Sequence, residues 1–201
     1  MKTKAIIVLV YFVFLSFSAG AQNENKPIVN DTSRNEICVG YGVLTSMDMA
    51  VSMVYLISLP FFWGVEVYEP HYSGAFFMAY QNKVSDRVRL SGTIAYEKIR
   101  LEGVTTNYTN TGNCYTVLGG VKFRYNKITG KVDLYGRFDL GIMFFDNREL
   151  GVDSPADTYT PSEVAFQISP IGVRFGKQIG GFLEFGYGNL GMINFGIDCR
   201  F

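Results

Sequence analysis

Residues 131–145 read KVDLYGRFDLGIMFF, and in this stretch apolar and polar side chains alternate one by one. Such alternation places successive side chains on opposite faces of a β-strand. The apolar set is Val132, Leu134, Phe138, Leu140, Ile142 and Phe144, with Gly136 in register, and the polar set is Asp133, Arg137 and Asp139. What the apolar face contacts is therefore the question that decides the fold.

Seven further segments favour β structure, which makes eight in all. Segments 87–99 and 114–126 repeat the alternation of 131–145, and segment 191–201 carries it to the terminal Phe201. The remaining segments are 37–44, 73–81, 163–176 and 181–188. Each is about nine residues or longer, which is the length of a tilted strand that crosses a bilayer.

The links between these segments alternate between long and short. The first, third and fifth, about 45–72, 102–113 and 146–162, are long, whereas the second, fourth and sixth are tight turns. Bacterial outer-membrane barrels have this asymmetry, with short periplasmic turns and longer external loops. The seventh link, near Asn189, is short where an external loop belongs, so one side of the external rim should be low.

Segment 163–176 contains a slip in the alternation. Ile168 and Ile171 lie on opposite parities, so the phase changes at Ser169-Pro170. We expect a β-bulge there, because bulges restore facing and tolerate proline. Without the bulge Arg174 would face lipid, at a cost of roughly 2–4 kcal/mol near mid-membrane.

The start of the chain has the order of a secretory signal. A basic start, an apolar core and small residues ending at Ala21, before Gln22, predict cleavage there. The apolar run is short for a spanning helix, which needs roughly 20 residues. We therefore predict a signal peptide at 1–21, a flexible leader at 22–35 and a barrel domain at 36–201.

Composition excludes several other classes of protein. The chain has 18 basic and 18 acidic residues, and removal of Lys2 and Lys4 with the signal leaves 16 against 18. A nucleic-acid-binding protein would need a basic patch or stripe. Three scattered cysteines and one histidine cannot form a disulfide framework or a zinc site. We predict no metal, no cofactor and no nucleic-acid partner.

Together these features resemble the small outer-membrane β-barrel family, the porin-like barrels that include the transmembrane domain of outer-membrane protein A. The resemblance covers about residues 36–201 and rests on pattern and on the aromatic last residue of NFGIDCRF. It implies an eight-stranded antiparallel transmembrane β-barrel of the all-β class, in the cell outer membrane and in contact with its lipids. It also implies that Phe201 is part of the signal read by the barrel-assembly machinery. No peptidoglycan-binding domain follows the barrel, so a tether to the cell wall is not expected.

The polar parity of the strands would then face the lumen. An eight-stranded barrel is just wide enough for side chains to fill it. We predict a plug of paired charges, in which Glu184 bridges Arg174 and Arg200; the alternative is that the pairs gate a narrow pore. The predicted lumen network is Arg89, Glu97, Lys122, Arg124, Asp133, Arg137, Asp139, Arg174, Glu184, Asp198 and Arg200, and Glu163 shares its parity.

The first long link contains an apolar stretch at 49–65. It could be a short helix and aromatic segment at the outer membrane interface, a wedge folded over the barrel mouth, or a partner-binding loop. Tyrosine and tryptophan suit the membrane boundary, which favours the interface. The predicted membrane-interface residues are Tyr55, Phe61, Phe62 and Trp63.

Three motifs that suggest chemistry have plainer explanations. GYGNLG at 186–191 matches a dinucleotide fingerprint, but a short strand follows it where the fingerprint needs a helix. His71 and Ser73 invite comparison with lipid-modifying barrels, yet residues so close on a strand usually diverge and no orienting acid is evident. Cys38 and Cys199 fall on opposite parities of neighbouring strands, so a disulfide is not expected.

The predicted function is non-enzymatic, as an integral envelope protein with a structural or loop-mediated binding role. The alternative is a narrow porin-like channel for ions or small solutes, and a weaker alternative is a lipid-modifying enzyme. The acids of the fifth link could gather a cation, although a solvated acidic surface is favoured. Neither the loop ligand nor the oligomeric state is predicted.

Overall fold

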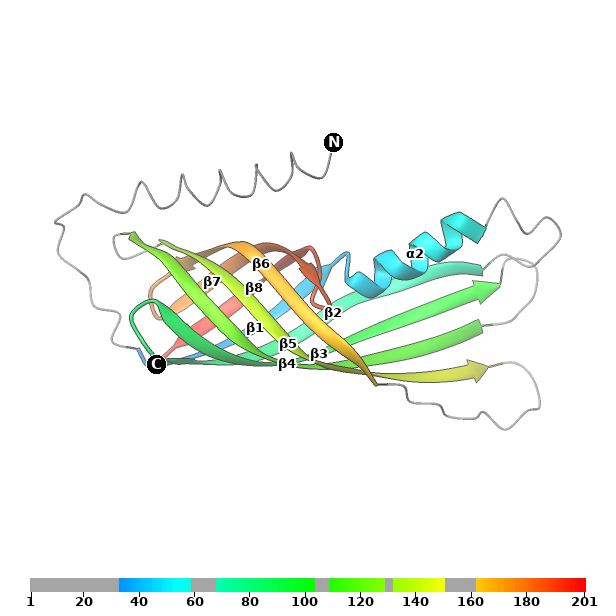
Figure 1. Cartoon of the computed structure of the whole chain (residues 1–201), viewed down its shortest axis with the longest axis horizontal. Coiled ribbons are helices and arrows are strands. Elements are labelled where there is room, and N and C mark those ends of the chain that lie inside the picture. Colours follow the sequence, from blue (N-terminus) through cyan, green and yellow to red (C-terminus); the bar gives the residue numbers. More distant parts are fainter. Residues whose placement is uncertain (1–32, 59–67, 104–108, 129–131, 151–161) are drawn as a thin grey trace.

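The computed structural model describes residues 33–58, 68–103, 109–128, 132–150 and 162–201. Eight antiparallel strands form a closed barrel in sequence order, and β8 pairs with β1 (Figure 1). The strands are β1 (Asn35–Val43), β2 (Tyr68–Lys83), β3 (Val88–Gly103), β4 (Thr109–Ile128), β5 (Val132–Leu150), β6 (Ser162–Gly176), β7 (Ile179–Gly188) and β8 (Ile193–Arg200). The predicted fold class is therefore confirmed.

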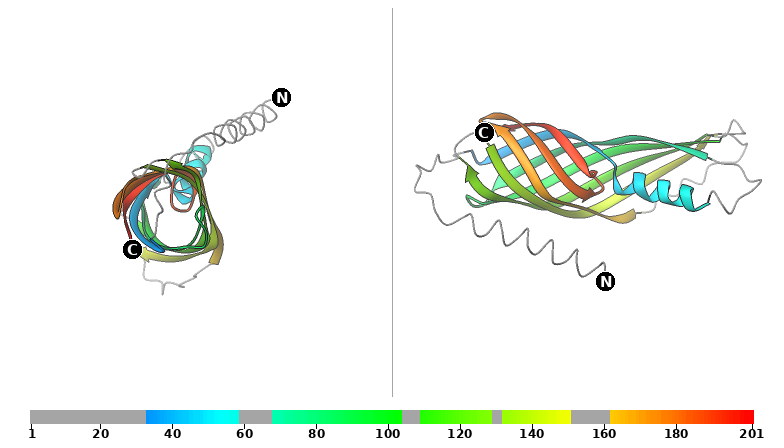
Figure 2. Two further views of the ribbon diagram at one scale, coloured as in Figure 1. Left: turned by 90° about the vertical axis from the view of Figure 1, so that its left-hand side faces the viewer. Right: turned by 90° about the horizontal axis from the view of Figure 1, so that it is seen from above.

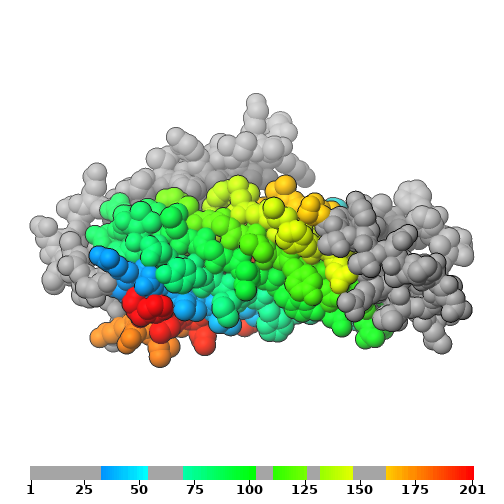
Figure 3. Space-filling model, turned by 90° about the horizontal axis from the view of Figure 1, so that it is seen from below, coloured from blue at the N-terminus to red at the C-terminus, as the bar shows by residue number. Residues whose placement is uncertain are grey.

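The barrel has an apolar outer surface and a polar interior. On β5 the side chains of Phe138, Leu140 and Ile142 are exposed, whereas Arg137 and Asp139 on the opposite parity are buried. The outward side chains of the other strands are also mostly apolar. The face of the barrel seen in Figure 3 is continuous. In hydrocarbon every backbone donor and acceptor needs a partner, and a closed sheet leaves no edge without one. The barrel therefore spans a membrane.

The slip in β6 is a bulge, as predicted. The pairing of β6 with β7 shifts register between Ile168 and Ile171, and both of these side chains are exposed on the outer surface. Ser169 and Arg174 are consequently buried in the lumen. Proline is accommodated at position 170 because the bulge interrupts the ladder there.

The external rim slopes. Strands β2 to β5 rise well beyond β1, β7 and β8 (Figure 1), and we call this raised part the protruding sheet. β3 and β4 remain paired as far as Glu102 and Thr109, so the third link is shorter than the predicted 102–113. The strands remain paired at their external ends, although apolar and polar residues no longer alternate there. The low side lies where the seventh link is short, as expected.

The first link contains the helix α2 (Ser46–Ser58). It lies at the end of the barrel opposite to the C-terminus, beside the raised part of β2 (Figures 1 and 2). Its Ser52 hydroxyl is 2.9 Å from the Tyr72 hydroxyl of β2. In the part of the chain that the structure describes, no helix has the length and apolar character needed to cross a bilayer.

Candidate functional site

The lumen is the part of the molecule where buried polar groups gather, and Glu36 lies at the centre of its periplasmic end. Glu36 is fully buried and accepts hydrogen bonds from Lys122 Nζ at 2.9 Å and from Arg200 Nε at 2.6 Å. The Nε atom of Arg89 is 3.9 Å from the same carboxylate. A buried carboxylate is costly unless it is paired and hydrogen-bonded. Three cations from three strands therefore converge on one acid of β1.

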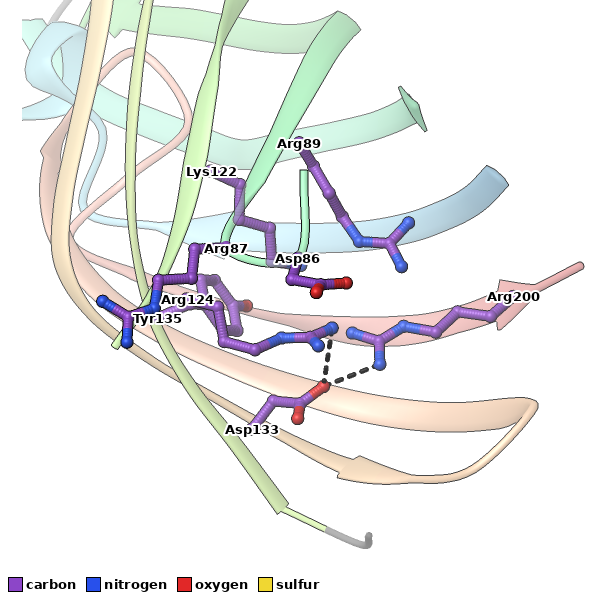
Figure 4. A pocket seen from close by; sticks show the side chains of 8 residues that line it. All are labelled: Asp86, Arg87, Arg89, Lys122, Arg124, Asp133, Tyr135 and Arg200. Atoms are coloured by element: carbon purple, nitrogen blue, oxygen red, sulfur yellow. Dashed lines mark hydrogen bonds and ion pairs between the residues drawn. The ribbon is translucent and has the colours of Figure 1, made fainter. Parts of the chain in front are cut away.

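A second acid, Asp133, lies closer to the periplasmic opening. Its Oδ2 atom is 2.6 Å from Arg200 Nη1 and 3.4 Å from Arg124 Nη2. Lys122 Nζ lies 4.0 Å from the centre of the Tyr135 ring, in a cation–π arrangement. These groups border a small hollow that is open to solvent (Figure 4). Its lining residues are Asp86, Arg87, Arg89, Lys122, Arg124, Asp133, Tyr135 and Arg200.

Arg174 makes a separate buried pair with Asp198. Its Nε atom donates to Asp198 Oδ1 at 2.7 Å. The remaining guanidinium donors bind the carbonyl oxygens of Gly176 at 2.7 Å and Lys177 at 2.9 Å, in the β6–β7 turn. The pair therefore joins β6 to β8 and also holds the turn between β6 and β7.

The prediction that Glu184 bridges Arg174 and Arg200 is wrong. Glu184 accepts a hydrogen bond from the Tyr135 hydroxyl at 2.8 Å, and its Oε2 atom is 3.7 Å from Arg137 Nη1. The strands are tilted, so a residue's neighbours across the lumen depend on its height along the barrel axis. Glu184 is at the height of Arg137, whereas the other two arginines reach Asp198 and Glu36 nearer the periplasmic end.

Arg137 and Asp139 form the middle of the network. They pair with each other from the same strand. Arg137 also donates to Thr93 Oγ1 at 2.6 Å, and Ser91 donates to Asp139 Oδ1 at 2.7 Å. Each of these charges therefore has polar partners on β3 as well as on β5.

Apolar side chains also occupy part of the lumen. Phe77 and Phe182 face each other with ring centroids 6.2 Å apart, and they belong to one buried cluster with Leu118, Met143 and Leu190. Buried apolar side chains in contact with one another leave few voids that a water molecule could occupy. We call this cluster the apolar layer; its Phe182 lies on β7 between the β6–β7 turn and Glu184.

The β7–β8 turn supplies part of this layer by folding inward. Leu190, at its tip, is 0% exposed, and its N–H donates to Gln167 Oε1 at 3.0 Å. Gln167 Nε2 in turn donates to the carbonyl oxygen of Gly191 at 3.0 Å. Asn189 Oδ1 accepts the N–H of Phe166 at 2.9 Å. A link predicted as a short external loop is thus held inside the barrel by side-chain amides.

At the external end, α2 begins on a polar cluster. The N–H of Asp48 donates to Thr45 Oγ1 at 3.1 Å, and the N–H of Thr45 donates to Asp48 Oδ2 at 3.0 Å. This reciprocal pair is a capping box, and it satisfies donors at the start of the helix. Thr45 also donates through Oγ1 to Glu97 Oε1 of β3 at 2.8 Å, so the cap is joined to the barrel wall.

The predicted lumen residues all carry side chains that face inward. Arg124 and Asp133, at the periplasmic opening, are less buried than the rest, and Glu163 is exposed at the start of β6. Glu97 lies at the external end, away from the other charges. Whether these residues serve a plug or a gate stays a prediction at this point. The buried members are Arg89, Glu97, Lys122, Arg137, Asp139, Arg174, Glu184, Asp198 and Arg200.

Glu36 was missed because the first strand was predicted to begin at residue 37. β1 starts at Asn35, whose backbone exchanges hydrogen bonds with Phe201, so Glu36 lies inside the ladder. Its parity with Cys38 and Gly40 could have placed it in the lumen. The inward turn at Leu190 had no comparable signal in the sequence, since its hydrogen-bond partners lie on β6, 23 or 24 residues away along the chain.

Several predicted residues lie outside the described part of the chain. These are the cleavage site at Ala21 and Gln22, and Phe61, Phe62 and Trp63 of the predicted interface segment. Tyr55 belongs to α2, so the segment includes a short helix, as one of the three alternatives had it. The interfacial role itself stays a prediction.

The hydroxyl of Ser73 is hydrogen-bonded to groups other than His71. Ser73 Oγ donates to the Gly74 carbonyl at 2.9 Å and accepts the N–H of Lys98 at 2.8 Å. His71 is exposed, with Nε2 3.7 Å from Glu102 Oε2. The histidine thus has an acid beside it that the sequence did not reveal, but the serine hydroxyl is occupied elsewhere. Among the described residues, no three histidine, cysteine or acidic side chains gather as metal ligands.

The terminal strand pairs closely with the first. Asn35 and Phe201 exchange backbone hydrogen bonds of 2.9 and 3.0 Å, and the Phe201 side chain is exposed. Cys38 is buried in the lumen and Cys199 is exposed on the outer surface, on opposite faces as their parity predicts. The role of Phe201 in assembly stays a prediction.

Comparisons with known proteins found similar proteins only among solved structures. No protein-family model and no curated protein matches the sequence. Two solved structures of the Yersinia pestis outer membrane protein Ail, its attachment invasion locus protein, are similar. The one bound to the heparin analogue sucrose octasulfate has a TM-score of 0.43 and 15% identity, and covers 84% of this chain and 94% of that chain. The other, in a phospholipid bilayer nanodisc, has a TM-score of 0.42 and 17% identity, and covers 84% and 99%.

The location follows from the barrel itself. An even number of antiparallel strands, an apolar outer band and a polar lumen are the features of outer-membrane barrels. The chain is an integral outer-membrane β-barrel protein.

Proposed function

We propose that the protein is a non-enzymatic, sealed membrane anchor that presents the protruding sheet for binding outside the cell. The observation that carries the proposal is the filled lumen. Ion pairs occupy its periplasmic half, and Leu190 and the rest of the apolar layer are buried in the lumen as well. A lumen filled in this way favours a scaffold over a channel.

The protruding sheet supports the binding role because β5 extends beyond its pairing with β6. Among the described residues, β5 pairs with β6 only as far as Phe144, yet β5 continues to Leu150 in its ladder with β4. Residues 145–150 span about 20 Å. The edge of a strand of this length can bind an extended peptide through main-chain hydrogen bonds. The expected ligand is therefore an extended segment of another protein.

A matched pair of proline variants tests this role. Successive strand residues direct their N–H groups to opposite sides. One of the variants Asn147→Pro and Arg148→Pro therefore removes a donor from the β5 edge that faces away from β4, and the other removes a donor from the β4 ladder. Refolded protein is used to select peptides from a displayed library of short random sequences. We expect the selected peptides to lose binding to the variant that lacks the edge donor. The variant that lacks the donor to β4 should instead destabilise the sheet. Equal binding to both variants and to the wild type would contradict the binding role.

The runner-up function is a narrow channel. It would require the apolar layer to open, and electrical recording separates it from the sealed anchor.

A further inference from the structure

The hollow at the periplasmic opening of the lumen is lined mainly by cations (Figure 4). Five basic side chains from the β2–β3 turn, β3, β4 and β8 border it, together with the acids Asp86 and Asp133. Glu36 lies next to these cations and accepts hydrogen bonds from two of them. Five cations thus meet three acids, and the described residues around the hollow carry two excess positive charges. The basic residues are Arg87, Arg89, Lys122, Arg124 and Arg200.

Three of these cations are buried and share the carboxylate of Glu36. Arg89, Lys122 and Arg200 are 5%, 6% and 7% exposed. Lys122 and Arg200 bind Glu36 directly, whereas Arg89 Nε is 3.9 Å from Glu36 Oε2, which is beyond hydrogen-bond length. Buried charges need opposite charges nearby, because they have lost their hydration. One carboxylate cannot neutralise three cations.

The second acid of the hollow is shared in the same way. Figure 4 shows the guanidinium groups of Arg124 and Arg200 turned toward Asp133, at 3.4 and 2.6 Å. The third acid, Asp86, lies on the exposed β2–β3 turn and pairs with Lys83 at 2.9 Å, so another cation shares its charge. Each acid around the hollow therefore serves more than one basic group or one that lies outside it.

The positive excess is local to this end of the lumen. Arg174 is matched by Asp198, and Arg137 is shared by Asp139 and Glu184. The deeper charges are thus balanced or slightly acidic. A cleft lined by charge of one sign raises the local concentration of counter-ions, because its low-dielectric walls concentrate the field. The hollow should therefore attract anions from the periplasm.

We propose that this hollow binds a small oxyanion of the phosphate class that carries two negative charges. Planar guanidinium groups donate parallel hydrogen bonds to phosphate oxygens, and a lysine adds a point charge. The hollow is small and open to solvent, which suits a single phosphate group. Its lining side chains face the lumen, whereas lipid contacts the outer face, so the ligand is a free anion. The site is independent of the binding role proposed for the protruding sheet.

The test is isothermal titration calorimetry of inorganic phosphate into the refolded full barrel in a nonionic detergent. Chloride keeps the ionic strength constant, so general screening does not change during the titration. We expect saturable binding of one phosphate per barrel, and weaker binding of acetate, which carries a single charge. Equal binding of acetate, or no saturable binding up to about 10 mM phosphate, overturns the proposal.

Arg124→Gln is the diagnostic variant, because Asp133 keeps Arg200 as a partner at 2.6 Å and the barrel should still fold. We expect phosphate binding to weaken by about tenfold or more through loss of a charge-assisted hydrogen bond. The matched control is Arg100→Gln, at an exposed arginine near the external end of β3, which should bind as the wild type does. If unboiled Arg124→Gln fails to migrate as folded protein, Arg89→Gln replaces it with the same expectation. Equal affinity of the diagnostic variant and the wild type overturns the proposal.

Urea unfolding separates a ligand site from a cluster of charges with a purely structural role. A ligand that binds only the folded state stabilises it, so phosphate should raise the unfolding midpoint of the wild type and of Arg100→Gln. The midpoint of Arg124→Gln should rise much less, and equal shifts in all three proteins overturn the proposal. Added phosphatidylglycerol identifies the source of the phosphate group. Unchanged binding of inorganic phosphate supports a free anion, whereas its loss overturns that assignment and gives the site to a lipid headgroup.

Discussion

Replacement of Glu36 by glutamine should be among the most destabilising single changes of charge in this barrel. The substitution keeps the size of the side chain but removes the negative charge on which Lys122, Arg200 and Arg89 converge. Glu36 is 1% exposed, so little solvent is available to replace it as a partner. Removal of one member of a buried ion pair costs about 3–5 kcal/mol, since the remaining charges stay buried without compensation. We expect a loss in this range.

The assay is reversible urea unfolding of refolded protein in lipid vesicles, with the gel-mobility difference between unboiled and boiled samples as the measure of folded fraction. The control is Glu102→Gln, which removes an acid with two partners on the exposed outer face of β3. Exposed pairs contribute about 0–1 kcal/mol, so this variant should unfold nearly as the wild type does. A loss for Glu36→Gln no larger than that of Glu102→Gln would refute the role of Glu36 as the centre of the network.

Three further changes test the packing of the lumen by the same unfolding assay. Leu190→Ala should lower the free energy of unfolding by about 2–5 kcal/mol, because the side chain is fully buried in the apolar layer. A loss below about 1 kcal/mol would mean that the layer is loosely packed. A methyl group at Gly42 would collide with the carbonyl oxygen of Leu190, whereas one at Gly92 would meet open space on the outer face. Gly42→Ala should therefore destabilise the barrel and Gly92→Ala should not. Equal effects of the two changes would contradict the inward position of the β7–β8 turn. Asp198→Asn should cost about 3–5 kcal/mol by leaving Arg174 buried without its acid, and the double change to Asp198→Leu and Arg174→Met should recover much of that loss; no recovery would mean that the pair does more than balance charge.

Much of the barrel could be predicted because a membrane barrel constrains every strand separately. Alternation in segments such as 131–145 reports which face meets lipid, and it identified all eight strands and the bulge before Ile171. The external ends of β2 to β5 were predicted too short, since outside the membrane neither face must be apolar. The helix α2 was only one of several alternatives, because Thr45 and Asp48 signal a cap but not a place on the barrel.

The interior was predicted in membership but not in pairing. Parity assigned twelve charges to the lumen; eleven of their side chains face inward, and Glu163 is exposed. Which acid meets which cation depends on strand tilt and register, and these are set by contacts between distant segments. Glu184 therefore met Arg137 and Tyr135 instead of its expected partners, and Glu36 became the partner of three cations.

The central claim is that the lumen is sealed, and planar-bilayer conductance of refolded residues 22–201 tests it most directly. The sample is first checked on a gel, where unboiled and boiled protein must migrate differently. We predict folded protein that is electrically silent, because buried ion pairs and the apolar layer that contains Leu190 and Phe182 occupy the lumen. Discrete, reproducible current steps from the folded protein would contradict the sealed anchor and support the narrow channel.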